Sequence, residues 1–413
     1  MRTLIITATI LAPAAASAGG YLIPSSDPRA LAVAQSSVAD EGGASALSLN
    51  TAALAGQEGL DIAAAGEMLN NRTEWSDPTL GTASLSEVST PPALAISYGA
   101  KLPGDKAWGV GVGLGAPAGG LLKWPMGWAG QESIQSVNQQ VVAFQAGAAF
   151  QLLPFVKIGA SYIRFQATEE LHQSLNFLDH FGDAGLAMSG GGDSFGVATE
   201  VRVPNMPLSF GINYTHASDI GLSGHAHFTN VPPAFQTMLH DQDVTETLLI
   251  PDVVFAGAAY EVMPNLKVMA AYSFEHWSDY KADVFKGSDG FTATVTRNYN
   301  NSQVLRLGGE WKKLPFLPQL TLRAGILRSI SDQPAETLSP SLTDASVWAP
   351  SIGAGFNILP NLRVDVGYEH AFFDTVTATG ADALPGTYKT NVDLVSLGVN
   401  WRMDPGMAKA PAK

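Results

Sequence analysis

Few side chains in this chain of 413 residues combine the types and spacing that catalysis requires. Gly192, Ser194 and Gly196 match G-x-S-x-G, the turn that exposes a nucleophilic serine in many hydrolases. That turn ends a strand and opens a helix, whereas this match follows a glycine run and opens a predicted strand. His225 and His227 could share a strand face, but two histidines do not complete a metal site. We therefore predict no catalytic residue, no metal and no cofactor.

Four basic residues have a spacing that could serve ligand binding. Each falls on the polar face of a strand-like segment whose other face is apolar. Such side chains could contact a substrate inside a barrel, or pair with acidic groups across its wall. We predict that the following residues contact substrate in the lumen: Lys267, Arg306, Arg323 and Arg363.

Large apolar side chains recur in two segments that we predict to be extracellular loops, 117–137 and 169–192. In the second segment they are spaced like one face of a short helix. Apolar side chains exposed in loops tend to mark binding sites, although the two loops could also simply pack on each other. The predicted substrate groove consists of Leu121, Leu122, Trp124, Met126, Trp128, Leu175, Phe177 and Phe181.

Composition limits the class of protein that could position these residues. Residues 1–18 read as a secretory signal peptide, with Arg2, an apolar run and Ala16-Ser17-Ala18 before the cleavage point. The net charge of −14 argues against nucleic acid as a partner. The chain has no cysteine, so neither disulfides nor zinc–thiolate sites form. Apolar content of 46% with only 15% charged residues is typical of a β-barrel that faces lipid.

Regularly spaced short turns give the strongest indication of the fold. Tight turns rich in proline alternate with longer polar loops, which is the pattern of an outer-membrane barrel with its short turns in the periplasm. Six such turns, with both termini on the same side, predict 14 antiparallel strands. The turns lie at residues 102–105, 152–154, 204–207, 263–265, 315–318 and 359–361.

The predicted fold is therefore all-β: a 14-stranded transmembrane barrel with a plug inside it. Residues 19–56 are small, polar and without strand alternation, and we predict that they form the plug. The barrel would span residues 57–403, and residues 404–413 would form a periplasmic tail. The alternative is a soluble β-sandwich with one wet face, but the signal peptide, the low charge and the regular hairpins favour the barrel.

One predicted strand, 106–116, differs from the others. Its four alternating glycines, Gly109, Gly111, Gly113 and Gly115, place no side chains on the lumen face. Glycine weakens strands and marks bends or close backbone approaches. Either the plug packs against a smooth wall there, or the strand is kinked and opens a lateral gap.

At this point the chain resembles the FadL/TodX family of outer-membrane transporters for long-chain fatty acids and other hydrophobic compounds. The resemblance covers nearly all of the mature chain and rests on the order and spacing of several short motifs. The family's Asn-Pro-Ala motif is Asn50-Thr51-Ala52 here, without the proline. The other matching segments are Gly20-Tyr21, Ala30 to Glu41, Ile250-Pro251-Asp252, His276-Trp277-Ser278, Leu307 to Trp311, Arg323-Ala324-Gly325 and Asp365 to Tyr368.

The resemblance implies a 14-stranded barrel in the bacterial outer membrane with an N-terminal hatch inside it. We expect Gly19, Gly20, Tyr21 and Asn50 to be hatch residues. It also implies passive uptake: capture between loops, binding in an interior pocket, and lateral release beside a kinked third strand. The glycine strand is third in order. The expected partners are a hydrophobic small molecule, membrane lipid and the barrel assembly machinery, with the protein acting as a monomer.

Two departures from the family bear on substrate and assembly. The segment Glu169 to His172, where a carboxylate-binding residue would be sought, is acidic, which leaves room for a neutral hydrocarbon or aromatic substrate. The last strand is followed by the segment 404–413 instead of ending in an aromatic residue. Three other functions remain as alternatives: a general porin without a plug, an outer-membrane lipase that depends on Ser194, and an adhesin or structural barrel.

Overall fold

The computed structural model describes residues 20–331, 333–380 and 383–403. Gly19, the predicted signal peptide and the predicted tail lie outside the described residues. The described chain forms strand segments, with short helices at its start. The segments are β1 (Gly59–Asp77), β2 (Gly81–Ser89), β3 (Pro92–Leu102), β4 (Lys106–Lys123), β5 (Ser136–Leu153), β6 (Val156–Asn176), β7 (Phe181–Arg202), β8 (Leu208–Thr215), β9 (Ser218–Thr229), β10 (Gln242–Ile250), β11 (Val253–Met263), β12 (Leu266–Glu275), β13 (Ala282–Gly287), β14 (Thr292–Thr296), β15 (Ser302–Trp311), β16 (Leu320–Ile330), β17 (Val347–Leu359), β18 (Leu362–Phe373), β19 (Val376–Ala378) and β20 (Gly386–Met403).

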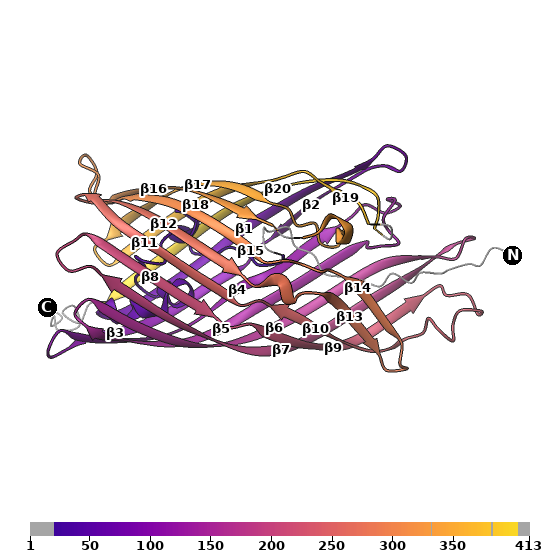
Figure 1. Cartoon of the computed structure of the whole chain (residues 1–413), viewed down its shortest axis with the longest axis horizontal. Helices are drawn as coiled ribbons and strands as arrows, with labels where there is room; N and C mark the ends of the chain where they lie inside the picture. The colour runs from indigo at the N-terminus through magenta and orange to yellow at the C-terminus, as the bar shows by residue number, and fades with distance from the viewer. Residues whose placement is uncertain (1–19, 332, 381–382, 404–413) are drawn as a thin grey trace.

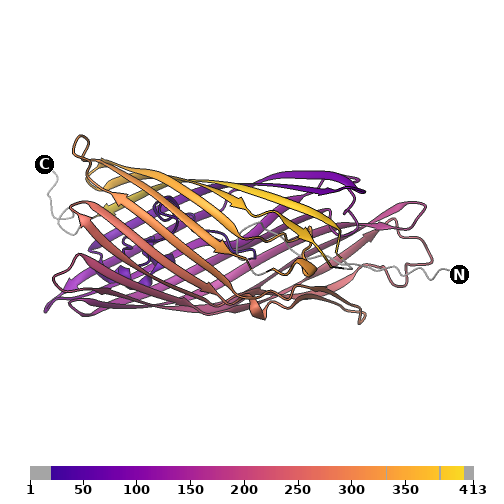
Figure 2. The ribbon, with the colours of Figure 1, turned by 45° about the horizontal axis from the view of Figure 1, so that its top comes forward.

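These segments make one closed antiparallel barrel (Figures 1 and 2). Six barrel strands are interrupted and therefore appear as the pairs β2/β3, β8/β9, β10/β11, β12/β13, β14/β15 and β18/β19. Counting each pair once gives 14 strands in the described residues, as the turn spacing predicts. β1 pairs with β20 from Leu60–Met403 to Ser76–Thr387, which closes the sheet without an edge.

Side-chain alternation follows the predicted register. In β18, Val366, Tyr368 and Phe372 are exposed on the outer face, whereas Asp365 and Glu369 are buried inside. A charge on the lipid face at mid-membrane costs about 2–4 kcal/mol, which fixes this register. Among the described residues, no helix is both long enough and apolar enough to cross a membrane.

The strands that flank the predicted loops are longer than expected, and the predicted extents of those loops are wrong. β4 runs to Lys123, and β6 and β7 leave only residues 177–180 as a loop. Beyond Tyr162 the outer face of β6 becomes polar, with Gln166 and Glu170, while the inner face becomes apolar, with Phe165 and Leu171. The lipid-facing pattern therefore inverts. The predicted short helix is also wrong, because β6 and β7 occupy this segment. A spacing of four residues fits one face of a strand as well as one face of a helix, so the pattern did not distinguish the two.

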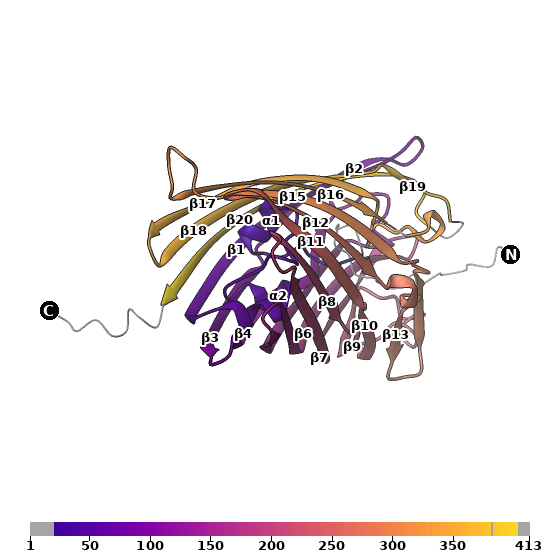
Figure 3. The same cartoon turned by 60° about the vertical axis from the view of Figure 1, so that its left-hand side comes forward.

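The segment from residue 20 to residue 56 folds inside the barrel as the predicted plug, which we call the hatch (Figure 3). It contains α1 (Pro28–Ala32), α2 (Ala46–Leu49) and the 3-10 helix η1 (Thr51–Gly56); further short 3-10 helices η2 (Trp277–Asp279) and η3 (Ala335–Thr337) lie between barrel strands. Asp27 caps α1, accepting from the Ala30 amide at 2.8 Å. The oxygen of the fully buried Asn50 side chain caps η1, and its nitrogen donates to the Val38 carbonyl at 2.7 Å. Thr51 occupies the first position of η1, where the family has proline, and the Asn50 cap forms without that proline.

Candidate functional site

The residues that suggested catalysis have structural partners. Ser194 is buried within β7, and its hydroxyl donates to the backbone carbonyl of His216, not to a histidine ring. His225 and His227 each face an aspartate on the neighbouring strand β10 or just before it, Asp243 at 2.6 Å and Asp241 at 2.5 Å. The described residues contain no group of three or more His, Cys, Asp or Glu side chains placed to hold a metal ion.

The hatch is held to the wall by an ion-pair network centred on Arg29. Its guanidinium lies 3.2 Å from Asp40, 3.4 Å from Glu41 and 3.1 Å from Glu310 on β15. Lys267 on β12 reaches Asp40 at 2.6 Å. Because several charges share one buried network, breaking one partner would leave others uncompensated. The network therefore anchors the hatch to the inside of the barrel.

Two more of the predicted lumen cations extend this network. Arg323 lies 2.7 Å from both Glu310 and Asp365, and Arg363 lies 2.8 Å from Asp365. Together with Lys267, they have acidic partners from the hatch or the wall. Arg306, the fourth predicted cation, has a different environment, described below.

Glu41 gives the hatch anchor a pH dependence. Burial raises the pKa of the Glu41 carboxyl to about 7, against the lowering effect of the Arg29 guanidinium. The folded hatch therefore favours protonated Glu41. This stabilisation is complete below the ordinary pKa of 4.5 and is lost as the pH rises through about 7.

We expect the free energy of local opening of residues 28–41 to fall between about pH 5 and pH 8, by roughly 3 kcal/mol at most. Native-state amide exchange, corrected for intrinsic rates, measures this opening. Glu41→Gln should remove the pH dependence, whereas Glu58→Gln, at an exposed site after the hatch, should retain it. Hatch protection in wild-type protein that rises with pH would contradict the assignment.

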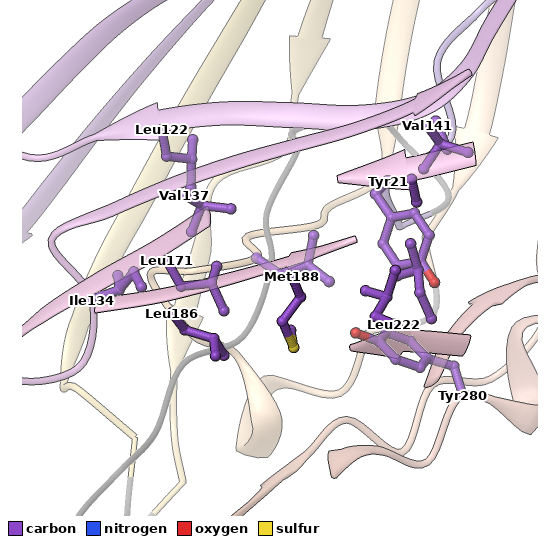
Figure 4. Close-up of a cluster of buried hydrophobic side chains, with 14 of the residues drawn as sticks. Tyr21, Leu122, Ile134, Val137, Val141, Leu171, Leu186, Met188, Leu222 and Tyr280 are labelled. Carbon is purple, nitrogen blue, oxygen red and sulfur yellow. The ribbon is translucent and has the colours of Figure 1, made fainter. Parts of the chain in front are cut away.

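The predicted groove residues do not lie together. Leu122, Trp124 and Trp128 are buried in an apolar cluster in the half of the barrel beyond the hatch, which we call the mouth cluster (Figure 4 shows part of it). The Trp124 and Trp128 rings stack at 4.3 Å, and both indole nitrogens donate to carbonyls. Leu175 and Phe177 belong to a separate cluster with Leu239. The remaining three residues, Leu121, Met126 and Phe181, lie in neither cluster.

The N-terminal segment of the hatch packs into the mouth cluster. Tyr21 is fully buried, its hydroxyl donates to the Leu249 carbonyl, and its ring packs edge-on against Trp277 at 5.1 Å and Tyr280 at 5.8 Å. Figure 4 shows Tyr21 beside Tyr280 and Leu222. At Gly20 an added Cβ would lie 2.6 Å from the Trp277 ring, so a larger residue could not approach as closely. Tyr21 is therefore itself part of the mouth cluster, and Gly20 lets the hatch approach Trp277 closely.

The same segment is bonded to β4. Leu22 forms an isolated antiparallel bridge with Ala118. The Ile23 amide donates to the Pro117 carbonyl at 2.8 Å, and the Gly119 amide donates to the Tyr21 carbonyl at 3.0 Å. The hatch thus adds a short strand to β4 from inside the barrel.

This bridge forms where the barrel wall is interrupted. The β3–β4 ladder ends at the pair Leu94–Leu114, and the β4–β5 ladder shifts register between Gly115 and Ala118. In the described residues, β2 pairs with β1 and has no ladder with β4. β2 and the part of β4 beyond Leu114 therefore lack the ladder hydrogen bonds that join β3 to β4. We call this place the wall break.

The glycines of β4 serve two different purposes. An added Cβ at Gly109 would lie 2.2 Å from the Leu54 carbonyl oxygen, and at Gly111 and Gly113 it would meet Leu54 and Leu47. Gly109 and Gly113 let the hatch approach the wall, as one of the two predicted alternatives holds, whereas at Gly111 the nearest atoms belong to Ser97 and Ile96 of β3. Gly115 differs, because no atom lies within 4 Å of an added Cβ, and it stands at the wall break.

A cavity of about 740 Å³ connects these features. Its lining extends past the hatch residues Leu22 to Ser26 and reaches Gly113 to Pro117 at the wall break. One apolar part of its lining, which we call the chamber, consists of Phe255, Val304, Leu327, Ala349, Phe373 and Leu394. Volumes of 300–1,000 Å³ are typical of small-molecule sites.

Three of the predicted cations, Arg306, Arg323 and Arg363, line the cavity, and Arg306 also packs against the chamber residue Phe255. Its Nη1 donates to the Ser273 hydroxyl at 2.7 Å, and its guanidinium lies 4.9 Å from the centre of the Phe255 ring. Both neighbours also line the cavity. The combination of one fixed polar group with apolar walls is the usual construction of a ligand pocket.

Comparison with known proteins agrees with this geometry. The family model for outer membrane protein transport proteins (OMPP1/FadL/TodX) matches residues 9–403. The chain belongs to this family. It is thus an outer-membrane protein of a family of transporters, not of enzymes.

A 47 kDa outer membrane protein of Pasteurella multocida is 27% identical over 205 residues, which cover 46% of each chain. Outer membrane protein P1 of Haemophilus influenzae is 30% identical over 129 residues, 30% of this chain and 26% of the relative. The chain thus matches less than half the length of these relatives.

Solved structures of FadL/TodX-type proteins share the fold. A Pseudomonas aeruginosa FadL homologue superposes with a TM-score of 0.81 at 15% identity, covering 93% of this chain and 99% of that one. The toluene transporter TbuX of Ralstonia pickettii gives 0.65 at 16% identity, covering 90% and 97%. The CymD monoaromatic hydrocarbon channel gives 0.70 at 16% identity, covering 94% and 99%.

Sequence reasoning missed the bridge between Leu22 and Ala118, the mouth cluster and the chamber. The chamber residues are apolar positions on lumen faces, for example Leu327 and Ala349, where the predicted pattern was polar. Apolar residues at alternate positions on both faces of one strand would have been the signal. The bridge has no sequence signal, because it joins two short irregular segments.

Proposed function

We propose that this protein is a passive channel that takes up hydrophobic small molecules, long-chain fatty acids or other apolar compounds, across the outer membrane. A molecule enters at the mouth, moves into the chamber as the segment from Gly20 to Ser26 shifts, and leaves sideways through the wall break into the membrane. The observation that carries this proposal is the single cavity that joins the chamber to the wall break beneath the hatch. No energy source is required, because the molecule moves down its own gradient.

Two related proteins support an aromatic compound as one substrate. They are named a toluene transporter and a monoaromatic hydrocarbon channel, and the chain has their fold. The chamber and the mouth cluster are both lined by aromatic and aliphatic side chains. Apolar surface in both places suits a solute that leaves water readily.

The alternatives from the sequence find less support. A general porin needs an open aqueous lumen, whereas here the hatch is tied to the wall through Arg29. A lipase needs Ser194 next to a base, whereas the Ser194 hydroxyl donates to a backbone carbonyl.

Uptake and conductance together test the proposed function. Outer-membrane vesicles that contain the protein should take up labelled oleate, toluene or octan-1-ol at low concentration faster than vesicles without it. Planar bilayers containing the protein should show no steady potassium conductance. Large ion conductance without faster uptake of any hydrophobic probe would assign the protein to the porins instead.

A further inference from the structure

A second gap in the ladders of the barrel lies between β10 and β13. These strands pair at two positions, Val244–Gly287 and Thr245–Lys286, although β10 runs on to Ile250. Extending the same register would pair Leu249 with Ala282, but the ladder between the described strands ends before them. The two strands therefore separate after the second pair, and this part of the wall is left without ladder hydrogen bonds.

A hollow of about 580 Å³ lies at this gap, and we call it the side window. It is lined by Thr247 and Val284 on the outer faces of β10 and β13, and also by Leu222 and Glu246, which are buried on the inner faces of β9 and β10. A hollow lined from both faces of a sheet passes into the wall. Its rim is polar, with Thr247 and Lys286 exposed, so the window opens above the apolar band that faces lipid.

The inner end of the side window meets the mouth cluster. Leu222 lines the window and also belongs to that cluster, where Figure 4 shows it beside Tyr21 and Tyr280. The Tyr21 hydroxyl donates to the backbone carbonyl of Leu249, at a position where the ladder with β13 provides no partner. A hatch side chain thus supplies a hydrogen bond at the gap from inside the barrel.

Glu246 makes the closed window less stable. Its side chain is 5% exposed, and neither carboxyl oxygen has a hydrogen-bond partner among the described residues. Burying a polar group without a partner costs free energy. Water entering an open window would solvate this carboxyl, so opening recovers part of that cost. The hydrogen bond from Tyr21 acts in the opposite direction and holds the window closed.

We propose that the side window is the entrance by which hydrophobic molecules dissolved in the surrounding water reach the mouth cluster, and that Tyr21 is the positioning residue that keeps it closed. A molecule passes between β10 and β13 when the Tyr21 hydroxyl leaves Leu249, and then continues toward the chamber. This inference rests on the proposed uptake function and assigns its point of entry.

Chemical blocking of the window tests this entrance. The natural chain has no cysteine, so Thr247→Cys gives one exposed thiol on the rim. Outer-membrane vesicles with this variant are treated with a bulky methanethiosulfonate reagent, and uptake of labelled toluene and oleate is measured. Uptake should fall by more than about fivefold and return when a reductant removes the group, because the group occupies the entrance. Thr229→Cys, exposed at the end of β9 and not part of the window lining, should keep its uptake after the same treatment.

Tyr21→Phe tests the positioning role, since it keeps the ring and removes the hydroxyl. Loss of one hydrogen bond should make the window open roughly three- to tenfold more often, with faster uptake and faster amide exchange at Ile23, which is bonded to β4. Tyr368→Phe, which loses a hydroxyl bond to Asp393 on the outer surface, should change neither. Modifying Thr247→Cys in the Tyr21→Phe chain should remove the gain in uptake, whereas a leak elsewhere in a loosened barrel would persist.

The outcomes separate the entrance from the uptake function itself. Full uptake by completely modified Thr247→Cys, with modification verified by mass spectrometry, would overturn the entrance, as would an equal loss in modified Thr229→Cys. A gain in Tyr21→Phe that survives blocking of the window would show that the hydroxyl does not act there. If neither the wild type nor the unmodified variants take up any probe, the proposed uptake function fails, and the entrance fails with it.

Discussion

A disulfide between positions 22 and 118 is expected to stop substrate uptake. Leu22 and Ala118 form an antiparallel bridge between the hatch and β4. Bridge partners have Cα atoms about 4.5–5.5 Å apart, within the range that a disulfide spans. The natural chain has no cysteine, so Leu22→Cys with Ala118→Cys gives one defined pair. The cross-link would hold Tyr21 against Trp277 and Tyr280, so the segment from Gly20 to Ser26 could not shift as the proposed function requires.

Uptake by the oxidised double variant should fall by more than about tenfold and return when a reductant is added, because a closed gate prevents passage without unfolding the protein. The matched control joins Thr377 to Thr387, a cross-strand pair between β19 and β20 away from the hatch. Its oxidation should leave uptake unchanged. Full uptake by the oxidised Leu22–Ala118 variant, with the disulfide confirmed by mass spectrometry, would show that the hatch does not move during transport.

Proline-rich turns and alternation were sufficient to predict the barrel, because both follow from rules that act locally. Proline cannot donate to a ladder, and each lipid-facing charge is costly, so strand number and register appear in the sequence directly. The plug was also predictable, since residues 20–56 lack alternation. Even the two alternatives for the glycines of β4 were both useful: Gly109 lies against Leu54, and Gly115 marks the wall break.

The site was less predictable, because its determinants join residues that are far apart in the chain. Trp124 looked like an exposed loop residue, but strands that rise above the membrane enclose it and Trp128. Whether a lumen cation binds ligand or the hatch depends on its partners across the barrel. Arg306 and Arg323 both line the cavity and show the same alternation, but Arg323 pairs with Glu310 and Asp365, whereas Arg306 packs against Phe255.

Filling the wall break should block release of substrate. Gly115 lines the cavity at the point where the β3–β4 ladder has ended, and an added Cβ there meets no atom within 4 Å. Gly115→Ala should therefore leave folding and uptake close to wild type. Gly115→Trp places a large apolar side chain in the same space and should reduce uptake by more than about tenfold, since the exit is then occupied.

The two substitutions separate the exit path from the stability of the barrel. Both variants should still differ in electrophoretic mobility between unheated and heated samples, as folded barrels do. Both should also still bind octan-1-ol in nanodiscs, because the chamber residues Leu327 and Phe373 are unchanged. Retained binding with lost uptake would place the block after the chamber. Met206→Trp, at an exposed residue of the short turn between β7 and β8, controls for the added indole and should not slow uptake. Wild-type uptake by Gly115→Trp would mean that substrate leaves by another route, and the path between the hatch and the periplasmic turns would then be the one to examine.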